Sequence, residues 1–319
     1  MSSCKYFLFI LLLLPMYTMA QSDQHYSMFM YNKLLYDPAY AGSRDVLSVN
    51  GLYRNQWTGI DGAPKVINVS VDGAVGSYMK PFRRVALGFS AGNELTGVET
   101  NNNLRAYYAY RIRFAHSVLS FGLSAGVDLY SAAYSRLTLH QQNDPNFATD
   151  VRNAALPAFG TGVYWSGDNF YCSASVPNLL QNVYDKSEVK AGNTIAQQIR
   201  GYYAGACYVF TANDAIKIEP QFLARYAINN VHQLPFSCDL NVSAIFYERF
   251  LAGITYRTDK SLEAIVHLQA SKRINIGYAY DYTLSGLNGY SGGAHELILG
   301  YDFVRDNNSF LTPRFIRKF

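Results

Sequence analysis

The residue types that could support catalysis lie in two copies of one short motif. Gly88–Gly92 (GFSAG) and Gly122–Gly126 (GLSAG) both match G-x-S-x-G, the pattern that presents a nucleophilic serine on a sharp strand-to-helix turn in α/β-hydrolases. Here no helical pattern follows either copy, and each lies within or at the end of a predicted strand. Small residues alternating on one face of a strand explain the motif better, so we predict that the protein is not an enzyme.

Histidine and cysteine supply no further candidate site. The histidines are scattered, the cysteines after residue 20 are Cys172, Cys207 and Cys238, and none of these residues shows metal-ligand spacing. Three cysteines are an odd number, which argues against a disulfide framework. We therefore predict no cofactor, no metal site and no disulfides.

The first twenty residues read as a signal peptide. Lys5 precedes the apolar core Tyr6–Leu14, and Thr18–Ala20 is a plausible cleavage site. The apolar core is too short for a membrane-spanning helix, which needs about 20 residues. We expect an exported chain that begins near Gln21. Since no later stretch is apolar enough for a helical span, an integral membrane protein with this sequence must be a β-barrel.

Composition and charge agree with a barrel. The chain has 27 Tyr and 19 Phe, and only 16% of its residues are charged, against about a quarter in soluble domains. Membrane barrels need aromatic girdles and tolerate few charges on the lipid face. Of the net charge of +4, Lys5 lies in the signal peptide and a net +3 in the tail after Phe303. The rest of the chain is neutral, which does not support a nucleic-acid-binding patch.

Apolar and polar residues alternate with a period of two in many short segments. In Arg273–Tyr282, for example, the even-numbered residues are Ile or Tyr and their neighbours are small or polar. The segments Leu104–Phe114 and Ile216–Tyr226 repeat the pattern, with charged residues on the second face. These inward charges are Arg105, Arg111, Arg113, Lys217, Glu219 and Arg225. One apolar and one polar face fit strands that meet lipid outside and water inside.

The fold class predicted is all-β, an antiparallel transmembrane β-barrel of about 14 strands with a short N-terminal periplasmic or plug segment. The predicted strands are 46–53, 66–75, 84–92, 103–113, 118–130, 158–165, 170–176, 200–210, 215–226, 236–246, 250–256, 262–270, 273–282 and 295–303. Four regions follow: signal peptide 1–20, periplasmic or plug segment 21–45, barrel 46–303 and basic C-terminal tail 304–319. Fourteen strands enclose more space than ordinary side chains fill, so a plug or water is needed.

The connectors between predicted strands are alternately long and short, as in outer-membrane barrels. With a periplasmic N-terminus, the long connectors are extracellular. They are Arg54–Lys65, Asn93–Asn102, Ser131–Pro157, Pro177–Ile199, Ala227–Pro235 and Thr283–Ala294. Most of the others are tight turns, although Gly76–Arg83 is longer and the extracellular Arg257–Lys260 is shorter than the pattern requires. A soluble β-sandwich has no reason to alternate in this way.

Two N-terminal segments carry a resemblance to a known family. They read Tyr31-Asn32-Lys33 followed by Asp37–Ser43 (DPAYAGS), then Tyr53–Trp57 (YRNQW) followed by Asp61–Pro64 (DGAP). These segments, with Gly293–Glu296 near the last strand, resemble the PorP/SprF family of Bacteroidetes outer-membrane proteins. Family members usually stop at an aromatic residue that ends the last strand, here Phe303, whereas this chain continues for sixteen residues.

The resemblance implies a non-enzymatic outer-membrane component of type IX secretion and gliding machinery in a Gram-negative bacterium. Its partners would be type IX machinery components, secreted adhesin-type cargo and outer-membrane lipid, with no nucleic acid. The predicted partner-binding residues are Arg54, Gln56, Trp57, Asp61, Tyr31, Asn32 and Tyr40.

Three other hypotheses remain open at this stage. A porin or diffusion channel would use the same inward charges, and an outer-membrane phospholipase would need a Ser–His pair on the barrel wall. Trp57 could also belong to an aromatic girdle rather than bind a partner.

Overall fold

A computed structural model of the chain describes residues 25–75, 84–137, 150–183, 198–228 and 236–304. The predicted signal peptide and all but the first residue of the predicted tail lie outside these residues. Among the described residues, no helix is both long and apolar enough to cross a membrane.

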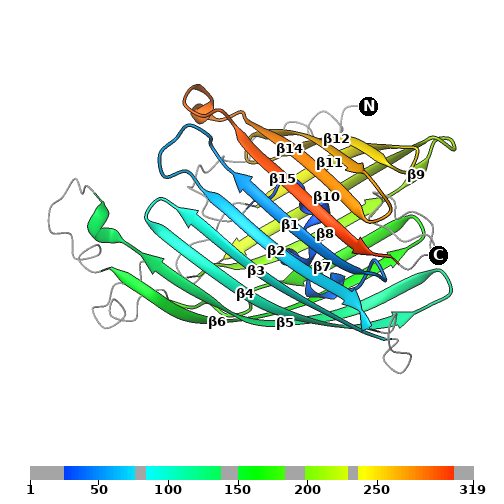
Figure 1. Cartoon of the computed structure of the whole chain (residues 1–319), viewed down its shortest axis with the longest axis horizontal. Helices are drawn as coiled ribbons and strands as arrows, with labels where there is room; N and C mark the ends of the chain where they lie inside the picture. The colour runs from blue at the N-terminus through cyan, green and yellow to red at the C-terminus, as the bar shows by residue number, and fades with distance from the viewer. Residues whose placement is uncertain (1–24, 76–83, 138–149, 184–197, 229–235, 305–319) are drawn as a thin grey trace, which may run out of the picture.

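One antiparallel sheet closes on itself to form a barrel (Figure 1). Its strands are β1 Leu47–Asn55, β2 Lys65–Ala74, β3 Val85–Thr96, β4 Glu99–Arg113, β5 Ser117–Ala132, β6 Val151–Gly167, β7 Phe170–Val176, β8 Arg200–Tyr208, β9 Phe210–Thr211, β10 Ile216–Ile228, β11 Ser237–Phe246, β12 Phe250–Arg257, β13 Ser261–Gln269, β14 Ile274–Thr283 and β15 Ala294–Phe303. The two residues of β9 continue β8 along the same neighbour, β10. The predicted barrel of about fourteen strands is therefore confirmed.

The pairing of β1 with β15 closes the wall, and alternation along each strand sets its two faces. In β14, Asn275, Gly277 and Ala279 are buried, whereas Ile276 and Tyr278 are exposed on the outside. This is the phase that the sequence predicts for the strand. An apolar outer face stabilises a barrel only in lipid, because in water it would remain unburied.

The connectors divide the barrel into two ends. The end that carries the connectors after β1, β3, β5, β7, β10, β12 and β14 is called the loop end. The opposite end of the barrel is called the turn end. At the turn end, described connectors such as 114–116, 168–169 and 247–249 are tight. At the loop end, most connectors are long, as predicted.

Several predicted loops are shorter than expected, because strands continue into them. Asn93–Asn102 is not a loop: β3 and β4 pair through it and leave only Gly97 and Val98 as the turn. β6 begins at Val151, inside the predicted loop Ser131–Pro157, and β1 includes Arg54 and Asn55. These strand ends contain many polar residues because the inward face of each strand lines the lumen there and not a packed core.

Strands β4, β5 and β6 are longer than a membrane crossing requires. They have 15, 16 and 17 residues, whereas about 9–11 residues cross a bilayer. Their excess length extends the wall at the loop end (Figure 1). A small apolar cluster of Tyr130, Ala132 and Leu156 packs there, so the extension is an ordered part of the wall.

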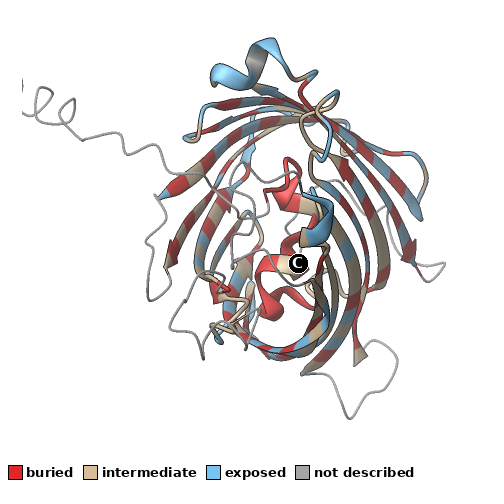
Figure 2. Cartoon of the chain, turned by 90° about the vertical axis from the view of Figure 1, so that its left-hand side faces the viewer, coloured by how far each residue is buried: buried red, intermediate tan, exposed pale blue. Residues whose placement is uncertain are grey.

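Residues 25–45, which we call the luminal segment, lie inside the barrel. They form the short helices η1 (Phe29–Tyr31), α2 (Lys33–Tyr36) and η2 (Pro38–Tyr40). Figure 2 shows these buried helices within the ring of strands. Met28, Met30 and Ala39 are fully buried and belong to one apolar cluster with inward residues of the wall. The largest core of the molecule is thus made between the luminal segment and the barrel.

Candidate functional site

The luminal segment runs through the barrel from the loop end to the turn end. Near its start, His25 lies 4.0 Å (Nε2 to Oδ2) from Asp259, which belongs to the loop-end turn between β12 and β13. At its end, Asp45 binds Arg111 and Arg113 near the turn-end limit of β4. The chain then turns back into β1.

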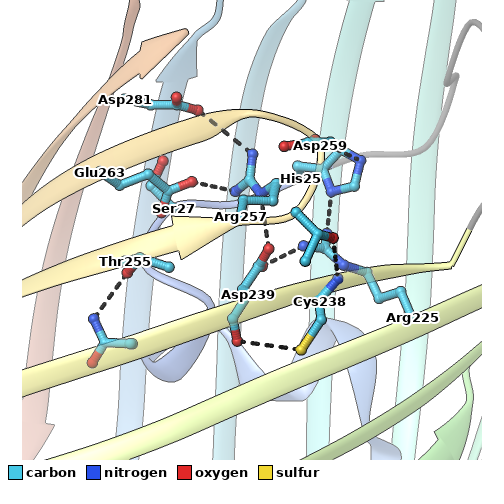
Figure 3. Close-up of polar contacts among 12 residues, drawn as sticks. His25, Ser27, Arg225, Cys238, Asp239, Thr255, Arg257, Asp259, Glu263 and Asp281 are labelled. Atoms are coloured by element: carbon cyan, nitrogen blue, oxygen red, sulfur yellow. Dashed lines mark hydrogen bonds and ion pairs between the residues drawn. The ribbon is translucent and has the colours of Figure 1, made fainter. Parts of the chain in front are cut away.

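A cluster of buried ions lines the loop-end half of the wall from β10 to β1. We call it the loop-end network; it consists of Arg54, Arg225, Arg257, Asp239, Glu263, Asp281 and Glu296. Arg257 lies at its centre, with Nε 2.9 Å from Asp239 Oδ1 and Nη2 2.5 Å from Glu263 Oε1. Figure 3 shows Arg257 between these two acids, with Asp281 above it.

The network holds the first residues of the luminal segment. The backbone N–H groups of Ser27 and Met28 donate to the two carboxylate oxygens of Glu296, at 2.8 and 2.9 Å. Arg54 donates to Ser27 Oγ at 2.7 Å and pairs with both Glu296 and Asp281. Glu296 is therefore shared between an arginine of the wall and the backbone of the segment.

Arg225 makes the second link between wall and segment. It contacts His25 Nδ1 and pairs with Asp239 (Figure 3). Burial and the nearby arginines hold the pKa of His25 well below its usual value, so this imidazole is neutral at pH 7. Because the network ions are buried, removing one partner would cost about 3–5 kcal/mol by leaving a buried charge uncompensated.

A lysine lies among three tyrosines in the middle of the lumen. Lys33 Nζ is 3.5 Å from the ring centre of Tyr171 and 5.7 and 5.8 Å from those of Tyr40 and Tyr164. The aromatic faces attract the ammonium group. Burial opposes the charge and lowers the pKa of Lys33 to about 7. The lysine thus joins α2 to inward residues of β6 and β7.

Glycines let the luminal segment touch the wall directly. A Cβ atom on Gly122 would lie 2.0 Å from the backbone nitrogen of Ala39, and one on Gly162 would lie 2.0 Å from Asp37 Oδ1. These glycines pair across β5 and β6. Gly122 is the first residue of the second G-x-S-x-G motif. This glycine leaves room for η2, so the motif has a packing role. In the first motif, Ser90 Oγ lies 2.9 Å from Tyr107 OH.

The turn-end attachment uses a second set of ions. Gly42 N donates to Asp72 Oδ2 at 2.7 Å, and Arg44 Nη2 lies 2.9 Å from Asp302 Oδ2. Arg111 Nη1 and Arg113 Nη2 each lie 2.6 Å from Asp45 Oδ1. The luminal segment is therefore attached to the wall by charged groups at both ends.

The structure separates the seven predicted partner-binding residues into two groups. Tyr31, Asn32 and Tyr40 belong to the luminal segment, where Tyr31 stacks on His267 with ring centres 3.9 Å apart. Arg54, expected in the first loop, is only 1% exposed and lies in β1. Its ion pairs face the lumen.

The other three residues lie in the loop after β1. Gln56 and Trp57 are partly buried, and Asp61 is exposed. Trp57 has a φ of +48°, which is rare for a bulky side chain and costs about 1–3 kcal/mol. Backbone hydrogen bonds hold the loop, including Thr58 N to Gly293 O at 2.8 Å. The connector between β14 and β15 thus supports Trp57.

An open cavity of about 470 Å³ lies at the loop end, between the luminal segment and the wall from β2 to β8. We call it the vestibule. Gln56 and Trp57 line it, together with inward residues of β3, β4 and β5. Among the described residues, no group of three His, Cys, Asp or Glu side chains could hold a metal ion.

Sequence reasoning missed the acids of the loop-end network. Asp239, Glu263 and Asp281 occupy inward strand positions that alternation marks only as polar. Only Glu296 carried a signal, because it ends the Gly293–Glu296 segment that resembles the family. The partners Ser27 and Glu296 are 269 residues apart, and no local pattern connects them.

Comparison with solved structures finds barrels of low sequence identity. Omp33, an outer membrane protein of Acinetobacter baumannii, is 7% identical with a TM-score of 0.44, covering 81% of this chain and 98% of that one. The NanC porin is 11% identical with a TM-score of 0.41, covering 81% and 100%. No curated protein matches the chain.

A family model identifies the chain more directly. The model for the type IX secretion system membrane protein PorP/SprF matches residues 18–301, which include the luminal segment and nearly all of the barrel. A membrane protein with a closed barrel and an apolar outer face resides in the outer membrane of a Gram-negative bacterium. The chain belongs to the PorP/SprF family of type IX secretion system membrane proteins.

Proposed function

We propose that this protein is a non-enzymatic docking component of the type IX apparatus, which retains secreted adhesin-type cargo and connects the outer membrane to periplasmic parts of the machine. The observation that carries the proposal is the luminal segment, which fills the centre of the barrel. It is attached at the loop end by hydrogen bonds to Glu296 and Arg54 and at the turn end by the ion pairs of Arg44 and Asp45. A diffusion channel needs an open lumen, and this segment obstructs it.

Trp57 and its neighbours are the proposed cargo contacts. Trp57 lines the vestibule rather than the lipid-facing wall, which favours a binding role over a place in an aromatic girdle. Its strained backbone is held by a second loop, as is common where a side chain is positioned for function. Arg54 contributes indirectly, because it is buried and orients the start of the luminal segment.

The test compares the two tryptophans of the chain. Trp165 is 46% exposed on the outer face near the turn end, as expected for a girdle residue. Tagged wild type, Trp57→Ala and Trp165→Ala would be purified from native membranes in mild detergent, and co-purifying proteins identified by mass spectrometry.

We expect Trp57→Ala to fold, as judged by heat-modifiability on gels, and to lose cargo at least tenfold, while Trp165→Ala retains it per folded molecule. Undiminished cargo on well-folded Trp57→Ala would contradict the contact. Absence of any type IX protein from the wild-type preparation would contradict the docking function itself.

A further inference from the structure

Side-chain amides form an ordered surface on the wall of the vestibule. Asn68, Gly92, Asn103 and Asp128 are cross-strand neighbours on β2, β3, β4 and β5, so they form one row across the sheet. Asn101 lies two residues from Asn103 on the same face. Neighbouring strands are about 4.8 Å apart, so these groups are spaced closely enough to contact one small ligand.

The amides of the row converge at a glycine on the cavity wall. A Cβ atom on Gly92 would lie 2.7 Å from Asn68 Nδ2 and 2.8 Å from Asn103 Oδ1, so the glycine lets the two amides converge. Asn101 Oδ1 is buried, and no described residue donates to it. A small rotation of the Asn101 side chain, which lines the cavity, would bring this oxygen to a ligand hydroxyl, the donor that a buried acceptor requires.

Aromatic rings border the same cavity. Trp57 comes from the first loop, Tyr26 and Tyr36 from the luminal segment and Tyr107 from β4. A ligand with apolar C–H faces and a hydroxylated edge could stack on such rings while the planar amides bind pairs of neighbouring hydroxyls. The volume of about 470 Å³ lies within the 300–1,000 Å³ typical of small-ligand sites.

The charges of the vestibule select against acidic ligands. Arg105 is neutralised by Asp128, with 2.8 Å between Nη2 and Oδ1. Arg54 also lines the cavity but is paired with Asp281 and Glu296. Glu94 and Glu99 line it as well, so neither arginine offers an uncompensated positive charge to an acidic ligand. A neutral or amino-bearing ligand fits this balance better than a phosphorylated or carboxylated one.

A peptide fits less well than a sugar. Peptides commonly bind by adding a strand to a sheet edge, but strands β2 to β5, which carry the amide row, are each paired on both sides. Apolar side chains that could form pockets for peptide residues are few in the lining. We propose that the vestibule binds a short neutral or amino-bearing oligosaccharide through Asn101, Asn103 and the surrounding aromatic rings. This proposal goes beyond cargo docking and does not depend on it.

The full-length protein in detergent would be titrated calorimetrically with three trimers of equal length. These are chitotriose, its deacetylated glucosamine counterpart and trigalacturonate. We expect saturable 1:1 binding of at least one of the first two, and binding of trigalacturonate at least tenfold weaker.

Variants on opposite faces of β4 give the matched control. Asn101→Leu/Asn103→Leu removes the luminal amides, whereas Asn102→Leu makes the same change on the outer face, where Asn102 bonds Asn93. We expect the double variant to bind the sugar about tenfold more weakly than wild type. Asn102→Leu should bind it as tightly as wild type. Cargo co-purification should be unchanged in both variants. The proposal is wrong if no sugar binds, if the acidic trimer binds as well as the others, or if the folded double variant binds like wild type.

Discussion

At the scale of single residues, buried ionisable groups define how the luminal segment is held. Arg54, Glu296 and Lys33 are buried, and each contacts a partner that is distant in the sequence. Such groups are costly to bury unless paired, so they fix one placement of the segment. The sequence pointed to Arg54 and Tyr40 through a family resemblance, but it could not show that they face the lumen, because that depends on contacts across the barrel.

Lys33 predicts a pH dependence of stability. Its pKa is about 7 in the folded protein and about 10.4 in an unfolded chain. Between these values the unfolded chain binds a proton that the folded protein has released. Stability therefore rises with pH in this window, by up to about 1.4 kcal/mol per pH unit.

The measurement is urea unfolding in lipid vesicles between pH 7 and 9. Relative to wild type, Lys33→Met should lack this rise, whereas Lys65→Met, at an exposed position, should keep it. Parallel pH profiles for wild type and Lys33→Met would show that Lys33 keeps its charge throughout.

At the scale of strands, alternation predicted the wall well and its ends poorly. The faces of β14 follow the period-two pattern from Arg273 to Tyr282 because one side meets lipid throughout. Asn93–Asn102 was misassigned as a loop because six of its ten residues are Asn, Gly or Thr, at positions 93, 96, 97, 100, 101 and 102. At the loop end the outer face no longer meets lipid, so the alternation that identifies a membrane strand fades there.

The lipid face predicts a cost that depends on depth. Ile276 is exposed on the outer face opposite Leu299 of β15, between the aromatic residues Tyr278 and Tyr301. Ile276→Arg should destabilise the barrel by about 2–4 kcal/mol, and Asn102→Arg, on the outer face near the loop end, by about 0–1 kcal/mol. Urea unfolding in vesicles measures both, and equal losses would mean that Ile276 does not face the bilayer core.

At the scale of the whole molecule, the direction of the luminal segment has a consequence for topology. His25 lies at the loop end, and cleavage near Ala20 would leave only four residues before it. Four residues span at most about 14 Å, so the mature N-terminus is expected near the loop end. A luminal segment that starts at the loop end differs from a segment that lies free in the periplasm. Alternation within the barrel strands could not have revealed this path.

Epitope tags in intact cells test this topology. A tag placed directly after the cleavage site and a tag in the connector between β5 and β6 should both be surface-accessible, whereas a tag at Asp168 in a turn-end connector should not. An N-terminal tag that is protected while the loop tag is labelled would contradict the path of the luminal segment.

Planar-bilayer conductance tests the central claim most directly, namely that the luminal segment closes the barrel so that the protein docks partners rather than conducting solutes. Wild type and a variant lacking residues 26–41 would be reconstituted at equal amounts of heat-modifiable, folded barrel. We predict that wild type gives no stable open channel and that the deletion variant gives large, long-lived conductance steps. Stable wild-type steps as large as those of the deletion variant would contradict the claim and favour a porin.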